Sequence, residues 1–110
     1  MNNIDQEIFN LINSQKKNFP LDQKFYVDNI IFEKDIEHIF SNQWVFIGHV
    51  SRIPNIGDYF TVSIGNESII VIRDKQNKIN CFYNVCRHRG SHICIESEGS
   101  LRKLICPYHA

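Results

Sequence analysis

Two short segments of the chain hold side chains whose types and spacing suit metal binding. The first contains Cys86 and His88, and the second contains Cys106 and His109. Seventeen residues, 89–105, separate them. A lone cysteine or histidine is usually structural, but two Cys-His pairs in one small chain are hard to obtain by chance. Because thiolate and imidazole bind zinc and iron–sulfur centres, the four residues predict a metal centre.

The spacing within each pair favours two irons over one zinc ion. Ligand atoms on one zinc lie under about 4 Å apart, whereas residues i and i+2 of an extended segment lie about 6.5 Å apart at Cα. Cys86 and His88 could therefore share one ion only in a tight turn. A two-iron cluster accepts the pair more easily, with both thiolates on one iron and both imidazoles on the other. Such a cluster carries less negative charge than a four-thiolate one, so it is reduced more easily and suits the transfer of single electrons.

The rest of the chain predicts helices followed by strands that would position these ligands. Apolar residues recur at helical spacing in 4–12 and in 32–44, where Trp44 completes the apolar face. Gly99 is expected to supply a positive φ in a turn at 97–100. Strand-like segments rich in β-branched and aromatic residues lie at 44–50, 58–65, 68–74, 79–85 and 101–106. The expected fold is mostly β, with a helical arm at 1–44 and an antiparallel β domain at 45–110.

Length, charge and cysteine count limit the possible partners. A chain of 110 residues has room for one small core. Its 12 basic and 12 acidic residues balance, so no overall field attracts nucleic acid or an anionic membrane. The N-terminus carries acids where a secretory signal would carry bases, and no apolar run is long enough to span a bilayer. We therefore expect a cytoplasmic protein whose four cysteines are not a disulfide framework.

The two segments "NVCRHRGS" and "LICPYHA" resemble the Rieske domain at the N-terminus of the large (alpha) subunit of Rieske non-haem iron oxygenases, the aromatic-ring-hydroxylating type. The resemblance extends over roughly residues 25–110. It implies a Rieske-type antiparallel β sandwich or barrel and a [2Fe-2S] cluster. It further implies that Cys86 and Cys106 ligate the buried iron and that His88 and His109 ligate the outer iron.

Positions 91 and 108 indicate the subtype. Rieske proteins of the cytochrome bc type have cysteines there that form a disulfide between the two loops, whereas this chain has Ser91 and Tyr108. The resemblance is thus to the oxygenase or ferredoxin type without that disulfide. Cys81 and Cys94 are expected to be small buried hydrophobic residues, and His92 is not needed as a ligand.

The resemblance also implies a function and partners. In the oxygenases a reductase or ferredoxin supplies electrons to the cluster, which passes them to a mononuclear Fe(II) for O2-dependent hydroxylation. That iron and the catalytic residues belong to a C-terminal domain, which is expected to be absent here. The chain is therefore expected to be a C-terminally incomplete fragment, inactive alone, of an oxidoreductase that forms a homotrimer or an alpha-beta hetero-oligomer.

Two other functions are compatible with the ligands. A stand-alone Rieske ferredoxin would carry electrons without catalysis, but such proteins begin almost directly with the sheet, whereas about 44 residues precede it here. A structural zinc module would use the same residue types. A zinc site has no visible absorption and no electron paramagnetic resonance signal, which separates it from an iron–sulfur cluster.

Overall fold

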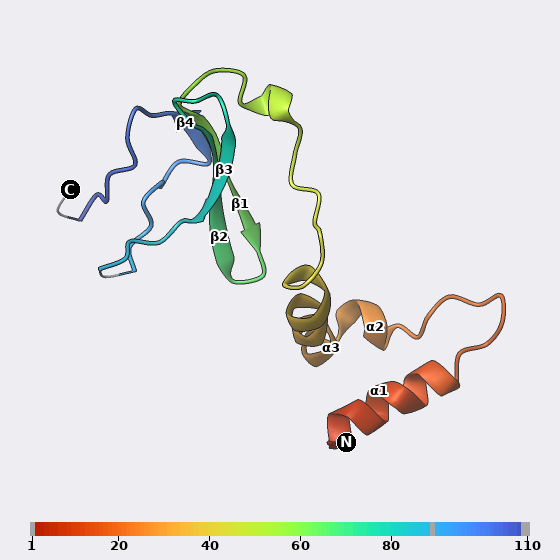
Figure 1. The fold of residues 1–110 in the computed structure, drawn as a ribbon. Helices are drawn as coiled ribbons and strands as arrows, with labels where there is room; N and C mark the ends of the chain where they lie inside the picture. Colours follow the sequence, from red (N-terminus) through yellow and green to blue (C-terminus); the bar gives the residue numbers. More distant parts are fainter. Residues whose placement is uncertain (1, 89, 109–110) are drawn as a thin grey trace. The chain divides into compact units, whose positions relative to one another are not determined.

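The computed structural model describes residues 2–88 and 90–108. The chain divides into two compact units, Met1–Trp44 and Val45–Ala110 (Figure 1). The first consists of helices and the second of a small antiparallel sheet with long connections. This confirms a mostly β fold preceded by a helical arm. Within the described ranges, no helix is long and apolar enough to cross a membrane.

Two of the helices in the first unit begin at side chains that cap them. The Asn2 side chain accepts a hydrogen bond of 2.8 Å from the N–H of Asp5, and Asp28 accepts one of 2.9 Å from the N–H of Ile30. Such caps satisfy N–H groups that have no partner inside the helix. The helices are α1 (Asn3–Asn13), α2 (Lys24–Val27), α3 (Asn29–Asp35) and the π-helix η1 (Ile36–Phe40).

The predicted helix at 32–44 ends earlier than expected. The backbone widens into the π-helix, where the N–H of Ser41 donates to the carbonyl of Ile36 over 2.9 Å. The Asn42 side chain then donates to the carbonyl of Glu37 over 2.6 Å. These two polar residues donate hydrogen bonds to carbonyl groups of the last helical turn, so the helix ends before Trp44. The Trp44 side chain is fully exposed. The prediction that Trp44 completes a packed helical face was wrong.

The sheet confirms the three central strand predictions. Its order is β3-β2-β1-β4, and all neighbours are antiparallel. Gly65, at a φ of 60°, lies in the turn between the first two strands, and Asn77, at 63°, lies in the next turn. The strands are β1 (Asp58–Ile64), β2 (Glu67–Arg73), β3 (Ile79–Tyr83) and β4 (Glu98–Ser100).

The outer strand predictions were wrong. Residues 44–50 and 101–106 form no strand, and the expected turn at 97–100 contains β4 instead. Gly99 pairs with Tyr59 of β1, and a Cβ atom at this glycine would lie 3.0 Å from the Tyr59 ring. The glycine therefore allows close packing in a strand, and it does not supply a positive φ.

Irregular segments cover the two faces of the sheet. Neighbouring strand residues point to opposite faces, so Tyr59 and Phe60 belong to different clusters. One cluster comprises Tyr59, Ile70, Ile72 and Cys94, packed against Ile93, Leu101 and Leu104. The other comprises Ile53, Phe60 and Val71, packed against Ile47, Val62 and Ile69. Residues 93–94 and 101–104, on either side of β4, therefore pack on one face, and the segment 47–53 packs on the other.

Asp74 organises the turn between β2 and β3. Its carboxylate accepts hydrogen bonds from the N–H of Lys78 at 2.9 Å, the N–H of Gln76 at 2.8 Å and the Asn80 side chain at 2.6 Å. The bond from Lys78 is the largest cause that holds the pKa of this carboxyl below its ordinary value, and Asn80 and Gln76 add to it.

We expect Asp74 to make the stability of the β unit pH-dependent. A lowered folded-state pKa gives stability above the unfolded-state pKa of about 3.9, and this stability is lost as the pH falls through the folded-state pKa. An NMR titration of Asp74 should give a pKa below its ordinary value of about 3.9. The variant Asp74→Asn should lose less of its free energy of unfolding than the unaltered protein when the pH falls below about 4. The exposed control Glu67→Gln should lose as much as the unaltered protein. A pKa of Asp74 at or above its ordinary value would contradict this.

Candidate metal centre

The first predicted ligand pair lies in the loop that follows β3. The Cys86 side chain is buried, with 8% of the residue exposed, whereas His88 is exposed. The Sγ atom of Cys86 lies 4.0 Å from Nδ1 of His88. The loop therefore brings a thiol and an imidazole side by side, with the thiol toward the protein interior and the imidazole toward solvent.

Backbone hydrogen bonds close this loop into the tight turn that the pair requires. The N–H of Cys86 donates to the carbonyl of Ser91 over 2.7 Å, and the N–H of Gly90 donates to the carbonyl of Cys86 over 2.9 Å. Gly90 has a φ of 73°, a left-handed conformation that glycine adopts without steric cost. Both main-chain groups of Cys86 are thus held, which fixes the position of its side chain.

A buried asparagine that sequence reasoning missed holds the whole loop in place. Asn84 is 2% exposed, and its amide nitrogen donates to Ser68 Oγ over 3.1 Å and to the carbonyl of Cys94 over 2.8 Å. Its Oδ1 atom accepts from the N–H groups of Ile93 and Cys94 over 2.9 and 2.8 Å. The signal in the sequence was a carboxamide directly after an apolar strand and two residues before Cys86, a predicted ligand.

The second pair is only partly described. Cys106 is half-buried in the segment that follows β4, and His109 lies outside the described residues. Among the residues that the structure does describe, no three or more His, Cys, Asp or Glu side chains are close enough to hold a metal ion. Figure 1 shows the segment after β3 and the segment after β4 running out on the same side of the sheet.

The remaining cysteines are distinct from the predicted ligands. None of the four cysteines, all of which lie in the described part of the chain, forms a disulfide with another, so no disulfide joins the two loops. Cys94 is buried as expected, and this burial raises the pKa of its thiol, which disfavours the thiolate form that binds metals. Cys81 was expected to be buried but is exposed, because it lies on the edge strand β3.

The donor set of the first loop fits a metal centre with mixed sulfur and nitrogen ligation. A separation of 4.0 Å is close to that of two ligands on one tetrahedral ion, so this pair alone suits either zinc or an iron–sulfur cluster. The buried thiol and exposed imidazole agree with a cluster whose cysteine-bound iron is inside and whose histidine-bound iron is outside.

Comparison with known proteins separates these possibilities. A family model described as the Rieske [2Fe-2S] domain matches residues 43–110. The glycine betaine monooxygenase oxygenase subunit of Pseudomonas aeruginosa is 40% identical over 99 residues, which are 90% of this chain and 23% of that protein. The biphenyl 2,3-dioxygenase alpha subunit of Rhodococcus jostii is 38% identical over 89 residues, or 81% of this chain and 19% of that protein.

Solved structures agree with the sequence matches. Naphthalene 1,2-dioxygenase from Rhodococcus sp., bound to indole, matches with a TM-score of 0.85 and 31% identity over 99% of this chain and 25% of its own. The chain thus spans a quarter or less of the length of these relatives. The match in fold includes nearly all of the chain.

We expect Asn84→Ala to destabilise the β unit by about 3 kcal/mol, because buried N–H groups of Ile93 and Cys94 would lose their acceptor. Urea unfolding measures this change, and hydrogen exchange at the two amides should lose its protection. Asn66→Ala, at an exposed asparagine in the turn between β1 and β2, is the control and should change stability by less than about 0.5 kcal/mol. Equal effects of the two substitutions would show that Asn84 does not organise the loop.

Proposed function

The chain belongs to the Rieske [2Fe-2S] domain family, and from this premise we propose that Cys86, His88, Cys106 and His109 ligate its cluster. Family membership and the match in fold confirm the expected cofactor and the Rieske-type fold. We further propose that the chain is the electron-transfer domain of an oxygenase large subunit. The observation that carries the proposal is the Cys86–His88 pair, held 4.0 Å apart in a closed loop after β3, within the residues that the Rieske [2Fe-2S] family model matches.

The opposite exposure of the two donors supports a division of roles. A buried thiolate is shielded from water and oxidants, so Cys86 would anchor the cluster in the loop. His88 is exposed, so its imidazole would offer the shortest route between the cluster and another protein. A [2Fe-2S] cluster held by two thiolates and two imidazoles transfers one electron at a time, with a reduction potential of roughly −150 to +300 mV.

The relatives support the wider proposal that the whole protein is a Rieske-type mono- or dioxygenase. A reductase or ferredoxin would supply its electrons, and a mononuclear iron outside residues 1–110 would carry out the O2-dependent hydroxylation. None of the residues in this chain is assigned a catalytic role. One relative is named for glycine betaine and the other for biphenyl, and their identities to this chain are similar. The proposed electron-transfer role does not depend on which kind of substrate the whole protein uses.

The proposed assembly and location follow the same family pattern. We propose that the whole protein forms a homo-oligomer or an alpha-beta hetero-oligomer, so that electrons pass to a neighbouring subunit. The four cysteines, none of which forms a disulfide in the described part of the chain, suit a reducing compartment such as the cytoplasm.

Ligand substitutions test the assignment. After anaerobic reconstitution with iron and sulfide, we expect visible absorption and, on reduction, an electron paramagnetic resonance signal. Cys86→Ser and His88→Ala should each remove most of the bound iron and this signal, because a cluster that loses one of four ligands is poorly held. Iron and sulfide analysis measures the loss.

Matched controls separate ligand loss from general damage. Cys81→Ser and His92→Ala change an exposed cysteine and an exposed histidine near the loop and should leave the cluster content unchanged. Retention of a full cluster in Cys86→Ser or His88→Ala would refute the ligand assignment. Stoichiometric zinc with no signal from iron would refute the electron-transfer role.

A further inference from the structure

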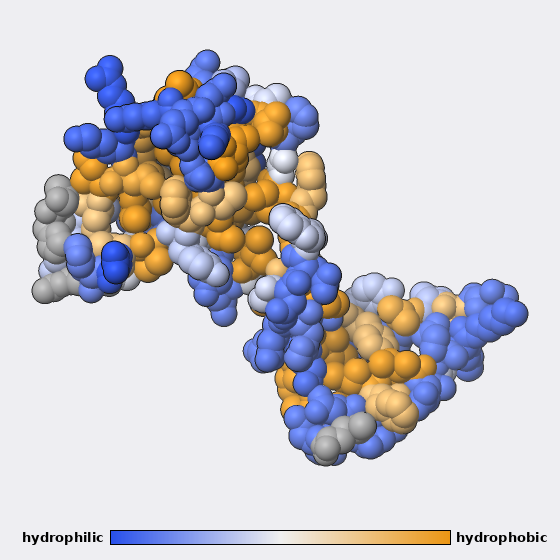
Figure 2. Space-filling model, viewed as in Figure 1, coloured by the Kyte–Doolittle hydropathy of each residue, from blue (hydrophilic) through white to orange (hydrophobic). Residues whose placement is uncertain are grey.

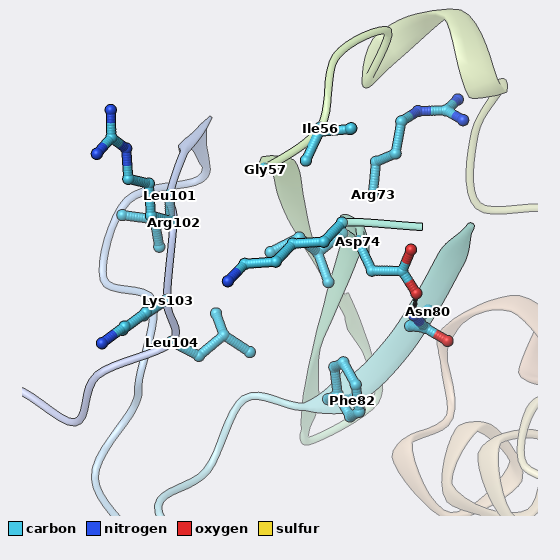
Figure 3. Close-up of a pocket in the computed structure, with 12 residues that line it drawn as sticks. Ile56, Gly57, Arg73, Asp74, Asn80, Phe82, Leu101, Arg102, Lys103 and Leu104 are labelled. Atoms are coloured by element: carbon cyan, nitrogen blue, oxygen red, sulfur yellow. Dashed lines mark hydrogen bonds between the residues drawn. The ribbon is translucent and has the colours of Figure 1, made fainter. Parts of the chain in front are cut away.

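A cavity of about 390 Å³ opens on the face of the sheet that the segment 101–104 covers (Figure 3). Figure 3 shows Leu104 and Phe82 on facing sides of it. Its volume falls within the range of about 300–1,000 Å³ that is usual for binding sites. The apolar residues that line it are Ile56, Ile72, Phe82, Leu101 and Leu104.

Positive charge surrounds this apolar cavity. Lys75, Arg102 and Lys103 line it and are exposed. None of these three forms an ion pair with another residue in the described part of the chain. The cavity therefore has cations that are available to a binding partner.

The other two charged residues of the lining are already engaged. Arg73 donates through Nε to the carbonyl of Ile53 over 2.7 Å and through Nη1 to the carbonyl of Asn77 over 3.2 Å. The carboxylate of Asp74 accepts the three hydrogen bonds that organise its turn. Hydrogen bonding leaves the Asp74 carboxylate charged, and it offsets one of the four cations in the lining. The cavity therefore keeps a net positive charge.

The exposure of the cavity walls favours a protein surface over a small molecule. A small-molecule site usually buries 70–90% of its ligand. Here Ile56 is 55% exposed and Phe82 is 49% exposed, so these walls would leave much of a small ligand in water. Figure 2 shows hydrophobic and hydrophilic side chains side by side over the visible face of the β unit. An apolar centre beside charged groups is the usual composition of a protein interface.

We propose that this cationic cavity docks an acidic segment of the electron-donor protein, which inserts an apolar side chain between flanking carboxylates. The inference rests on the proposed electron-transfer function and specifies the partner for it. Arg102 and Lys103 lie in the segment that leads to Cys106, so a protein bound here would contact the chain next to the second ligand loop. Opposite charges would also speed the encounter of the two proteins.

Synthetic peptides test the docking on the whole 110-residue chain. The probe is the acetylated hexapeptide EELLEE. Its binding is detected by changes in the backbone amide shifts in NMR spectra of the ¹⁵N-labelled protein. We expect shifts at Ile72, Phe82 and Leu104, and weaker binding at higher salt because the charges are exposed. The comparison peptides are KKLLKK, with reversed charge, and EEGGEE, without the apolar side chains. Both should bind far more weakly than EELLEE.

A charge reversal with a matched control completes the test. Arg102→Glu combined with Lys103→Glu should weaken EELLEE binding about tenfold. Lys16→Glu combined with Lys17→Glu reverses another adjacent exposed pair, in the helical unit, and should leave binding unchanged. Circular dichroism and thermal unfolding should match the unaltered protein, since all four side chains are exposed.

Four outcomes would overturn the proposal. Two concern the peptides: no binding of EELLEE at about 1 mM, or equal binding of either comparison peptide. The other two are an equal loss of EELLEE affinity in the two double variants, and amide shifts confined to residues away from the cavity. The peptide assay needs no cluster. A failure of docking and a failure of the ligand assignment are therefore read from separate measurements.

Discussion

The hydrogen bonding of the buried Asn84 carboxamide is the interaction on which the loop with the first proposed ligand pair depends. Its four hydrogen bonds use both donors and both acceptor positions of the amide, and they join the end of β3 to Ser68 of β2 and to Ile93 and Cys94. Within the described residues, no buried side-chain nitrogen or oxygen is left without a partner. A fully satisfied buried amide specifies one loop conformation, because any other would leave polar groups buried and unpaired. The loop between residues 84 and 94 is thus closed at its base.

That closed loop gives the two donors of one pair different surroundings. Cys86 is held at both its main-chain groups and is buried, while His88, two residues further on, is exposed. A cluster bound by such a pair would be anchored inside and accessible outside, as electron transfer between proteins requires. The same residue types on a flexible strand would not separate these roles.

The proposed ligands and the proposed docking surface lie on irregular segments supported by a small rigid sheet. Residues 93–94 and 101–104, on either side of β4, pack on one face of the sheet, and the second stretch continues to Cys106. The cations around the apolar cavity come from that stretch and from the turn after β2, so one proposed ligand and part of the docking surface share a connection. Loops on a fixed scaffold commonly hold functional residues because they can vary without disturbing the core.

The sequence by itself determined the family and the helix and strands named below, and it supplied the residues that we propose as ligands. Local spacing reveals local patterns. These are the Cys-x-His and Cys-x-x-His pairs, the helix at 4–12 and the strands β1, β2 and β3. Only the tertiary structure decided that residues 98–100 form a strand, because pairing with β1 overrides local preference. The helix ends before Trp44 through local bonds of Ser41 and Asn42, which the apolar periodicity does not reveal. The role of Asn84 was also decided there, since its partners are 9, 10 and 16 residues away and no local pattern identifies them.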